Sequence, residues 1–265
     1  FSLGEVSMTD DAGNGINSVS PFGMGVDLGY SRKLSDSFSM GVALRYIYSD
    51  LAFDETMATD DVKGASAFAA DISGYYTTYP MVGRNECQWS LGFNISNIGS
   101  KVSYSGGNEP AFLPANLKLG TMFMFPLADY HTLALALDVN KLLVPVKPRL
   151  TDYEDQIAYE DALQDWKDMS PISGIFKSFN DAPGGFKEEL REITYSIGAE
   201  YSYNQQFFLR GGYYHESAYK GNRQYFGLGA GFALNVVRLD AAYMIATAQS
   251  SPLDQTLRFS LTFDM

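Results

Sequence analysis

Three consecutive residues, His215-Glu216-Ser217, supply a base, an acid and a hydroxyl group, which are the residue types of a hydrolytic site. A nucleophile, its base and the residue that orients the base must lie within hydrogen-bond reach of one another. These three residues end a stretch of alternating hydrophobicity, and consecutive side chains of a strand point to opposite faces. The other histidine, His131, falls in a short turn, where we expect it to be solvated. We therefore predict no catalytic residue and no enzymatic activity.

A second string with chemical potential is Gly227-Leu228-Gly229-Ala230-Gly231, which resembles a glycine-rich phosphate loop. It lies inside an alternating stretch with no helix after it, whereas a phosphate loop opens a helix. Its glycines share one face of a strand, where they leave space for a close side chain or a plug. The acidic residues Asp60-Asp61 and the run 152–155 lack the spacing and the glycine of a calcium loop. We expect neither a cofactor nor a metal site.

Bulk properties narrow the class of protein further. The net charge of −12 argues against a nucleic-acid partner, because such partners require a basic surface. The single cysteine, Cys87, cannot form an internal disulfide. No run of eighteen apolar residues is present, so the sequence predicts no spanning helix. The chain begins at Phe1 without an initiator methionine or a signal peptide. We expect one domain, 1–265, of which an N-terminal portion is missing.

The C-terminal residues alternate strictly between apolar and polar. Leu257, Phe259, Leu261 and Phe263 share one face of a strand, and polar residues occupy the other. A sheet of this kind suits a wall that faces lipid outward and a polar lumen inward. An aromatic share of 14% fits the girdles at two membrane interfaces. The pattern predicts an all-β fold, a transmembrane antiparallel β-barrel of a bacterial outer membrane.

The same alternation recurs along the chain and predicts about twelve strands, separated by short and long connections in turn. Outer-membrane barrels have short periplasmic turns and long outside loops. This order predicts a multi-pass wall with extracellular long loops and a periplasmic C-terminus. The predicted strands are 1–8, 20–34, 37–50, 65–79, 88–104, 115–127, 132–144, 193–203, 206–215, 224–235, 237–248 and 256–265.

Ten charged residues inside the predicted strands fall on the inward parity. An Arg or Lys facing lipid at mid-depth would cost about 2–4 kcal/mol, and this parity avoids that cost. Acids and bases are equal in number, so we expect cross-strand ion pairs and a filled interior rather than an ion-selective pore. The predicted lumen charges are Asp27, Arg45, Asp71, Lys118, Asp138, Glu200, Arg210, Arg238, Asp240 and Arg258.

The longest connection, 145–192, breaks the rhythm of the strands. Residues 152–169 could form a helix, and Ser170-Pro171 is typical of a helix N-cap followed by proline at the first helical position. A loop of this length is usually functional or disordered. Its apolar content predicts order, through packing on the barrel mouth, on a partner, or on both. Exposed aromatic residues beside a Pro-Gly-Gly hinge are typical anchors of a docking loop. The predicted partner-binding residues are Phe176, Phe179, Pro183, Gly184, Gly185 and Phe186.

Several strings resemble the PorV family (also called LptO), which are outer-membrane components of the type IX secretion system within the FadL-like barrel superfamily. The resemblance runs through nearly the whole chain, and the string 174–190 is the most specific. Two others look like features of the superfamily at large. The strings are 41–49, Asn94-Ile95-Ser96-Asn97-Ile98-Gly99, Leu113-Pro114-Ala115-Asn116-Leu117-Lys118-Leu119-Gly120 and 174–190.

The resemblance implies a barrel of fourteen strands, two more than the sequence pattern predicts here. It implies a non-enzymatic protein that binds secreted cargo through the C-terminal signal domain of the cargo. It also implies that the protein caps the lateral opening of the large secretion pore, SprA or Sov. Cargo would then be shuttled to an attachment complex of the sortase PorU with PorQ and PorZ. Outer-membrane lipid and lipopolysaccharide would surround the barrel, and no nucleic acid is involved.

Two other functions are compatible with an outer-membrane barrel. A FadL-type transporter of hydrophobic small molecules needs an apolar lumen, and the charged, glycine-rich inward residues argue against one. A hydrolase centred on His215 needs an acid or a nucleophile on the same rim.

Overall fold

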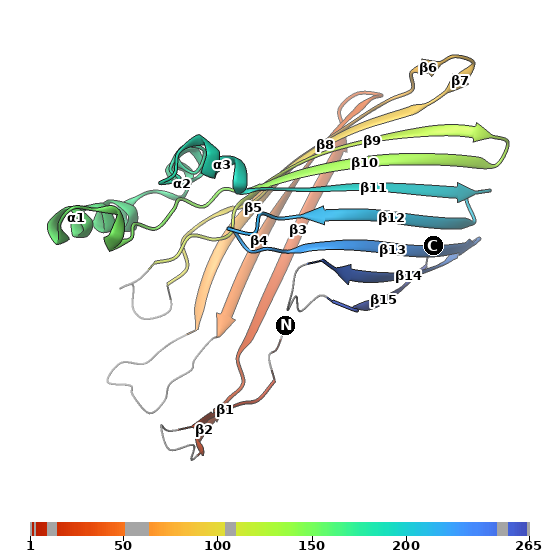
Figure 1. Cartoon of the computed structure of the whole chain (residues 1–265). Helices are drawn as coiled ribbons and strands as arrows, with labels where there is room; N and C mark the ends of the chain where they lie inside the picture. The colour runs from red at the N-terminus through yellow and green to blue at the C-terminus, as the bar shows by residue number, and fades with distance from the viewer. Residues whose placement is uncertain are drawn as a thin grey trace.

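The computed structural model describes residues 2, 4–9, 15–50, 64–103, 110–247 and 254–263. Its main element is an eleven-stranded antiparallel sheet in which neighbours in the chain are neighbours in the sheet, from β3 to β15 (Figure 1). The acidic pair Asp60-Asp61 lies outside the described residues. The strands are β3 (Phe22–Lys33), β4 (Phe38–Asp50), β5 (Ala65–Thr78), β8 (Gln88–Gly99), β9 (Asn116–Ala128), β10 (His131–Leu142), β11 (Ile193–Tyr203), β12 (Phe207–His215), β13 (Gln224–Leu234), β14 (Val237–Ala246) and β15 (Leu257–Phe263).

These eleven strands confirm all but one of the predicted strands, with bounds that differ by a few residues. The exception is the strand predicted at 1–8. Residues Val6–Thr9 (β1) instead pair with Gly15–Val19 (β2) in a separate two-stranded sheet. The connection predicted at 80–87 also contains a small hairpin, Met81–Val82 (β6) with Asn85–Glu86 (β7). Alternation alone could not separate a wall strand from a local hairpin, because both have a period of two.

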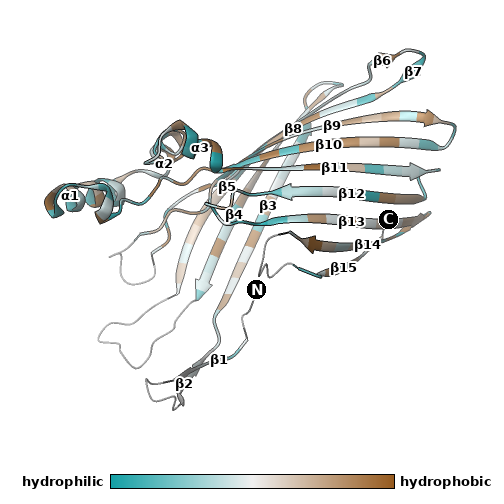
Figure 2. Ribbon diagram, viewed as in Figure 1, coloured by the Kyte–Doolittle hydropathy of each residue, from teal (hydrophilic) through white to brown (hydrophobic). Residues whose placement is uncertain are grey.

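Hydrophobic and hydrophilic residues interleave along the strands (Figure 2), so the two faces of the sheet differ in hydropathy. On one face, large apolar side chains stand exposed, such as Leu28 at 74% and Leu44 at 63%. A soluble protein rarely leaves so many large apolar side chains uncovered, so a lipid-facing wall explains this face. The opposite face carries the charged residues and most of the glycines. This charged face is called the inner face below.

Connections of the sheet are unequal at its two ends. Short turns follow β3, β9, β11 and β13, and the β6–β7 hairpin lies at the same end (Figure 1). At the other end the strands lead into the longer connections, and the connection between β10 and β11 there carries the helices η1 (Leu150–Asp152), α1 (Gln156–Asp168), α2 (Pro171–Lys177) and α3 (Phe186–Arg191). No helix in the described ranges has the length and apolar character needed to cross a bilayer.

One polar network fixes the geometry of β4, β5 and β8 on the inner face. The pairing of β5 with β8 shifts register at Asp71, and Asn97 opposite adopts φ of 58°. The Asn97 N–H donates to Asp71 Oδ1 at 2.8 Å, and Arg45 Nη1 donates to Asn97 Oδ1 at 2.5 Å. Asparagine tolerates the left-handed region better than most residues, which suits it to this bulge. Asn97 Nδ2 also donates to the Pro114 carbonyl at 3.1 Å, so two of the family-like strings meet here.

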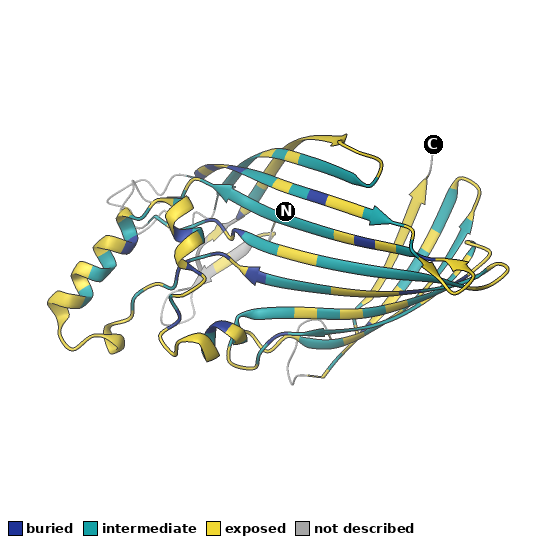
Figure 3. Cartoon of the chain, turned by 90° about the horizontal axis from the view of Figure 1, so that it is seen from above, coloured by how far each residue is buried: buried dark blue, intermediate teal, exposed yellow. Residues whose placement is uncertain are grey.

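The sheet has two free edges within the described residues, β3 and β15, and these are not paired with each other. Ser2 forms an isolated antiparallel bridge with Phe22 at the β3 edge. From above, the strands form a curved wall, and the helices extend beyond its end, mostly exposed (Figure 3). The wall of this chain is therefore curved and open in the part that the structure describes.

Candidate functional site

The long connection between β10 and β11 forms an ordered lobe at the long-loop end of the sheet. Its first helix, α1, begins at the predicted acidic stretch, where Asp155 caps it by accepting a hydrogen bond from the Ala158 N–H at 2.7 Å. Trp166 anchors the helix: it is 9% exposed, and its Nε1 donates to the Pro145 carbonyl at 3.2 Å. Its ring also meets Phe112 edge to face at 5.1 Å. The predicted order through packing on the mouth is present.

A lysine from the connection between β8 and β9 also holds α1 in place. Lys101 Nζ donates to the Lys167 carbonyl at 2.6 Å and to the Trp166 carbonyl at 3.4 Å, at the C-terminal end of α1. A cation at this end satisfies free carbonyls and complements the helix dipole. Burial lowers the pKa of Lys101, although Asp168 nearby acts in the opposite direction. The α1 helix is thus fixed to the sheet by its last turn.

The second helix, α2, starts as the sequence predicts. Ser170 accepts from the Ser173 N–H at 3.1 Å, and Pro171 occupies the first helical position. Gly174 is buried in the helix, where an added Cβ would lie 2.8 Å from Phe112 and 3.2 Å from Pro145. A small residue here lets α2 pack closely on the residues that hold α1.

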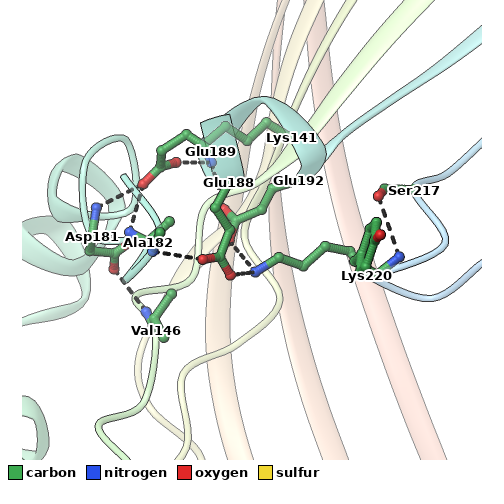
Figure 4. Close-up of polar contacts among 11 residues, drawn as sticks. Lys141, Val146, Asp181, Ala182, Glu188, Glu189, Glu192, Ser217 and Lys220 are labelled. Atoms are coloured by element: carbon green, nitrogen blue, oxygen red, sulfur yellow. Dashed lines mark hydrogen bonds and ion pairs between the residues drawn. The ribbon is translucent and has the colours of Figure 1, made fainter. Parts of the chain in front are cut away.

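Three glutamates of the third helix and its C-cap, with two lysines, make an ion-pair cluster that we call the rim clamp: Lys141, Glu188, Glu189, Glu192 and Lys220 (Figure 4). Lys141 Nζ lies 2.9 Å from Glu189 Oε2 and 2.9 Å from Glu192 Oε2. Lys220 Nζ lies 2.6 Å from Glu188 Oε1 and 3.0 Å from Glu192 Oε1. The clamp therefore joins α3 both to the end of β10 and to the connection after β12.

Backbone groups next to the hinge add hydrogen bonds to the clamp. Glu189 Oε1 accepts from the N–H groups of Asp181 and Ala182, each at 2.8 Å, and Asp181 Oδ2 accepts from the Val146 N–H at 2.8 Å (Figure 4). Gly185 has φ of 68°, a conformation that favours glycine, directly before α3. The predicted Pro-Gly-Gly hinge is therefore a turn, and it places α3 within ion-pair distance of Lys141 and Lys220.

Glu188 and Glu189 of the clamp have lowered pKa values, whereas the pKa of the neighbouring Asp181 is raised. Burial alone would raise the pKa of Glu189, but hydrogen bonds from Lys141, Ala182 and Asp181 hold it below its usual value. The Lys220 ammonium and the Gly184 N–H lower the pKa of Glu188. Burial raises the pKa of Asp181, partly offset by the Val146 N–H, and Glu189 raises it further. Asp181 Oδ1 has no hydrogen-bond partner in the described part of the chain.

The predicted aromatic residues remain largely uncovered on this ordered lobe. Phe176 is 73% exposed and Phe186 is 77% exposed, whereas Phe179 is 48% exposed and lies near Lys141. We call Phe176, Phe179 and Phe186 the aromatic surface. Pro183, Gly184 and Gly185 lie in the turn before α3 and position Phe186 at its start.

The ten charges predicted for the lumen lie on the inner face, and nine of them form three ion-pair groups. Arg45 joins Asp27 at 2.5 Å and Asp71 at 3.2 Å. Lys118 lies 3.3 Å from Asp138. The third group consists of Glu200, Arg210, Asp240 and Arg238. Arg258 makes no ion pair among the described residues.

Glycines make room for two of these groups. Gly231 lies directly opposite Asp240 and Gly120 directly opposite Asp138. A Cβ at either glycine would collide with the aspartate opposite. The glycine-rich string of β13 thus accommodates a close side chain, one of the two explanations that the sequence suggested.

The geometry at His215 does not assemble a hydrolytic array. The His215 ring stacks on Tyr195 with centroids 4.8 Å apart. Glu216 instead pairs with Arg223 through both carboxylate oxygens, at 2.7 and 2.8 Å. The prediction for His131 needs correction, because this residue starts β10 and its ring packs against Tyr201, whose hydroxyl lies 2.5 Å from Nδ1.

Sequence reasoning missed most of the residues that hold the lobe. Lys101 falls inside the predicted strand 88–104, Lys141 lies near the end of the predicted strand 132–144, and Lys220 lies in the connection before the predicted strand 224–235. Only the local signals, the Ser170 cap and the hinge glycines, were visible in the sequence. Partners 48 residues apart, such as Lys141 and Glu189, leave no periodic signal.

A large antiparallel sheet with one apolar and one charged face, and with its long connections at one end, defines a protein of the outer-membrane β-barrel class. The family described as Type IX secretion system protein PorV matches residues 1–149, more than half of the 265 residues, and the chain belongs to this family. The protein is accordingly a type IX secretion component of the bacterial outer membrane. The matched residues include the network of Arg45, Asp71 and Asn97 and end before α1.

No curated protein matches the chain. Among solved structures, the outer membrane phospholipase A from Escherichia coli aligns with 92% of this chain and 84% of its own, at 10% sequence identity and a TM-score of 0.38.

Proposed function

We propose that this protein is a non-enzymatic carrier that binds secreted cargo through the C-terminal signal domain of the cargo. In this proposal it caps the lateral opening of the large secretion pore, SprA or Sov, and delivers cargo to the attachment complex of PorU, PorQ and PorZ. The long connections face the cell exterior, and the C-terminus faces the periplasm. Lipid and lipopolysaccharide contact the apolar face of the sheet.

The observation that carries the proposal is an ordered lobe with an uncovered aromatic surface. The lobe is fixed to the sheet through Trp166 and the rim clamp, yet Phe176 and Phe186 are 73% and 77% exposed. Rigid aromatic anchors contribute much of the binding energy of protein interfaces, because little entropy is lost when they dock. The lobe is therefore suited to hold a partner outside the wall.

Capture of partners by purified protein tests this role. Phe176→Ala combined with Phe186→Ala should abolish recovery of both the pore subunit and cargo with a C-terminal signal domain, while the barrel still assembles. The matched control is Ile157→Ala, because Ile157 is also 73% exposed but lies on α1. Unchanged capture by the double variant would contradict the role of the aromatic surface. Phe179→Ala should have the smaller effect, because Phe179 is less exposed.

One observation favours a second candidate function, a FadL-type transporter of hydrophobic small molecules. A cavity of about 600 Å³ lies along the inner face and is lined largely by small residues such as Ala134, Ala136 and Gly227. A transporter would release lipid or fatty acid from this cavity on denaturation. Mass spectrometry of the purified protein, before and after delipidation, would detect it. The paired charges around Arg210 at one part of the cavity make this the weaker candidate.

A further inference from the structure

A second cavity, of about 630 Å³, lies at the long-loop end of the inner face, and we call it the mouth cavity. Residues of β9, β10, β11 and β12 line it, together with Glu192 and Lys220 of the rim clamp. Its volume is within the range of sites that bind ligands. None of its lining residues belongs to β3 or β15, so it does not depend on what lies beyond the edges of the sheet.

Four neighbouring strands each contribute one uncharged polar side chain to this cavity: Asn116, Asn140, Thr194 and Tyr214. Their amide and hydroxyl groups have no hydrogen-bond partner within the described residues. Amides and hydroxyls both donate and accept, so together they can satisfy a ligand with alternating donors and acceptors.

The charged residues of the cavity are instead occupied with one another. Arg223 is held by both oxygens of Glu216, and Lys220 by Glu188 and Glu192. A charged ligand would have to displace these pairs and leave a partner unpaired, which is costly. The groups of the mouth cavity that are free to bind a ligand are therefore uncharged.

The other wall of the cavity is formed by the last residue of β10 and the extended chain that follows it. Leu142, Val144 and Val146 face the cavity, while Leu143 and Pro145 between them are buried. The N–H and C=O groups of Val144 make no hydrogen bond within the described residues. Val144 therefore offers one N–H and one C=O to an extended ligand, beside apolar side chains spaced like alternate residues of a strand.

We propose that the mouth cavity binds an extended, uncharged segment of polypeptide, supplied by the secreted cargo. The segment would form main-chain hydrogen bonds with the side chains of Asn116, Asn140 and Thr194. Its own apolar side chains would pack on Leu142, Val144 and Val146. This inference rests on the proposed function only for the source of the segment. The cargo would then contact this protein at two places, the aromatic surface of the lobe and the mouth cavity on the inner face.

A polypeptide fits these features better than an oligosaccharide, the other neutral ligand rich in hydrogen-bonding groups. Sugars pack on free aromatic faces, but the Tyr214 ring is already stacked on Tyr225, with centroids 5.1 Å apart and planes 15° apart. The apolar strip of Leu142, Val144 and Val146 matches side chains of alternate residues in a strand.

Site-specific cross-linking with a purified signal domain of a type IX cargo protein tests the inference. The photo-reactive residue p-benzoylphenylalanine replaces Tyr214 in one sample and Phe176 in another, both in the full chain in detergent. Cross-links at both positions, with the one at 214 mapping to a single extended segment, would support both contacts. A cross-link at 176 alone would overturn the mouth cavity and leave the aromatic surface standing. A cross-link at 214 alone would overturn the aromatic surface, and no cross-link at either position would overturn both.

Binding measurements with conservative variants give a second test. Asn140→Leu, Thr194→Val and Tyr214→Phe together remove hydrogen-bonding groups with little change in volume, and should weaken binding of the signal domain at least about tenfold. The matched control is Tyr225→Phe, because Tyr225 stacks on Tyr214 but does not line the mouth cavity. Equal affinity of the triple variant and the wild type would overturn the inference. So would displacement of the signal domain by a soluble lipopolysaccharide oligosaccharide that binds at this cavity.

Discussion

Ion pairs hold both the curved wall and the lobe at its end, but they do so in different ways. In the wall, Arg45 meets Asp27 and Asp71 from the two strands that pair with its own strand. In the rim clamp, Lys141 meets Glu189 across 48 residues of chain. The backbone ladder already aligns the wall charges, whereas the clamp must itself order the segment that carries its carboxylates. Damage to the wall network should therefore unfold the sheet, and damage to the clamp should release only the lobe.

The largest effect should follow from Arg45→Met in the wall. This change leaves Asp27, Asp71 and Asn97 without their shared donor, and we expect the free energy of unfolding to fall by about 2–4 kcal/mol. Urea unfolding in detergent micelles, followed by heat-modifiable mobility on gels, measures it. Lys118→Met is the matched control, because its pair with Asp138 is more exposed and should cost about 0–1 kcal/mol. An equal loss of unfolding free energy in the two variants would mean that the network of Arg45 stabilises the sheet no more than a single exposed ion pair does.

A smaller and local effect should follow from Glu189→Gln in the clamp. Glutamine can still accept from the N–H groups of Asp181 and Ala182 but loses the charge that pairs with Lys141. We expect the free energy that keeps the lobe docked to fall by about 1–3 kcal/mol, because Lys141 then retains Glu192 as its one acidic partner among the described residues. Hydrogen exchange of the amides at 181 and 182 should rise, while exchange in the strands stays unchanged. Faster exchange in β10 and β11 as well would show that lobe and wall are one cooperative unit.

The sequence was sufficient for features with a period or a local signature. Alternation predicted the eleven strands of the sheet, because side chains in a strand repeat every two residues. It also predicted that the ten charged residues share one face. The Ser170 cap and the Gly185 turn were visible because helix starts and tight turns select few residue types. The resemblance to PorV also named the family that the comparison confirms for 1–149.

The sequence was insufficient wherever two distant segments meet. Nothing in the alternation distinguishes Val6–Thr9, which pairs locally with Gly15–Val19, from a strand of the wall. The bulge at Asp71 and Asn97 is a single extra residue in an otherwise regular pattern, and only register reveals it. The mouth cavity needs four strands and the chain after β10 to be placed before its free polar groups become neighbours.

Acidification should release the lobe without any mutation. The pKa of Glu189 is lower in the docked lobe than in a free chain, so its contribution is fully present above the ordinary value of 4.5 and is lost as pH falls through the lowered value. We expect exchange at 181 and 182 to rise only below about pH 4.5. Glu189→Gln should flatten this dependence. Release of the lobe between pH 6 and 8 would contradict the assignment, because neither Glu189 nor Glu188 titrates there.

The smallest effect, and the one of opposite sign, should come from Asp181→Asn. Burial and the nearby Glu189 raise the pKa of Asp181, so its ionised form weakens docking at neutral pH, and docking is favoured as pH falls through the raised value. Asparagine keeps an oxygen that can accept from the Val146 N–H and removes the charge. We expect the docked lobe to gain roughly 0.5 kcal/mol, seen as slower exchange at the Val146 amide. Asp181→Ala removes the acceptor and should speed that exchange. If Asp181→Asn behaved like Asp181→Ala, the ionised carboxylate of Asp181 would help to hold the lobe, as that of Asp71 helps to hold the wall.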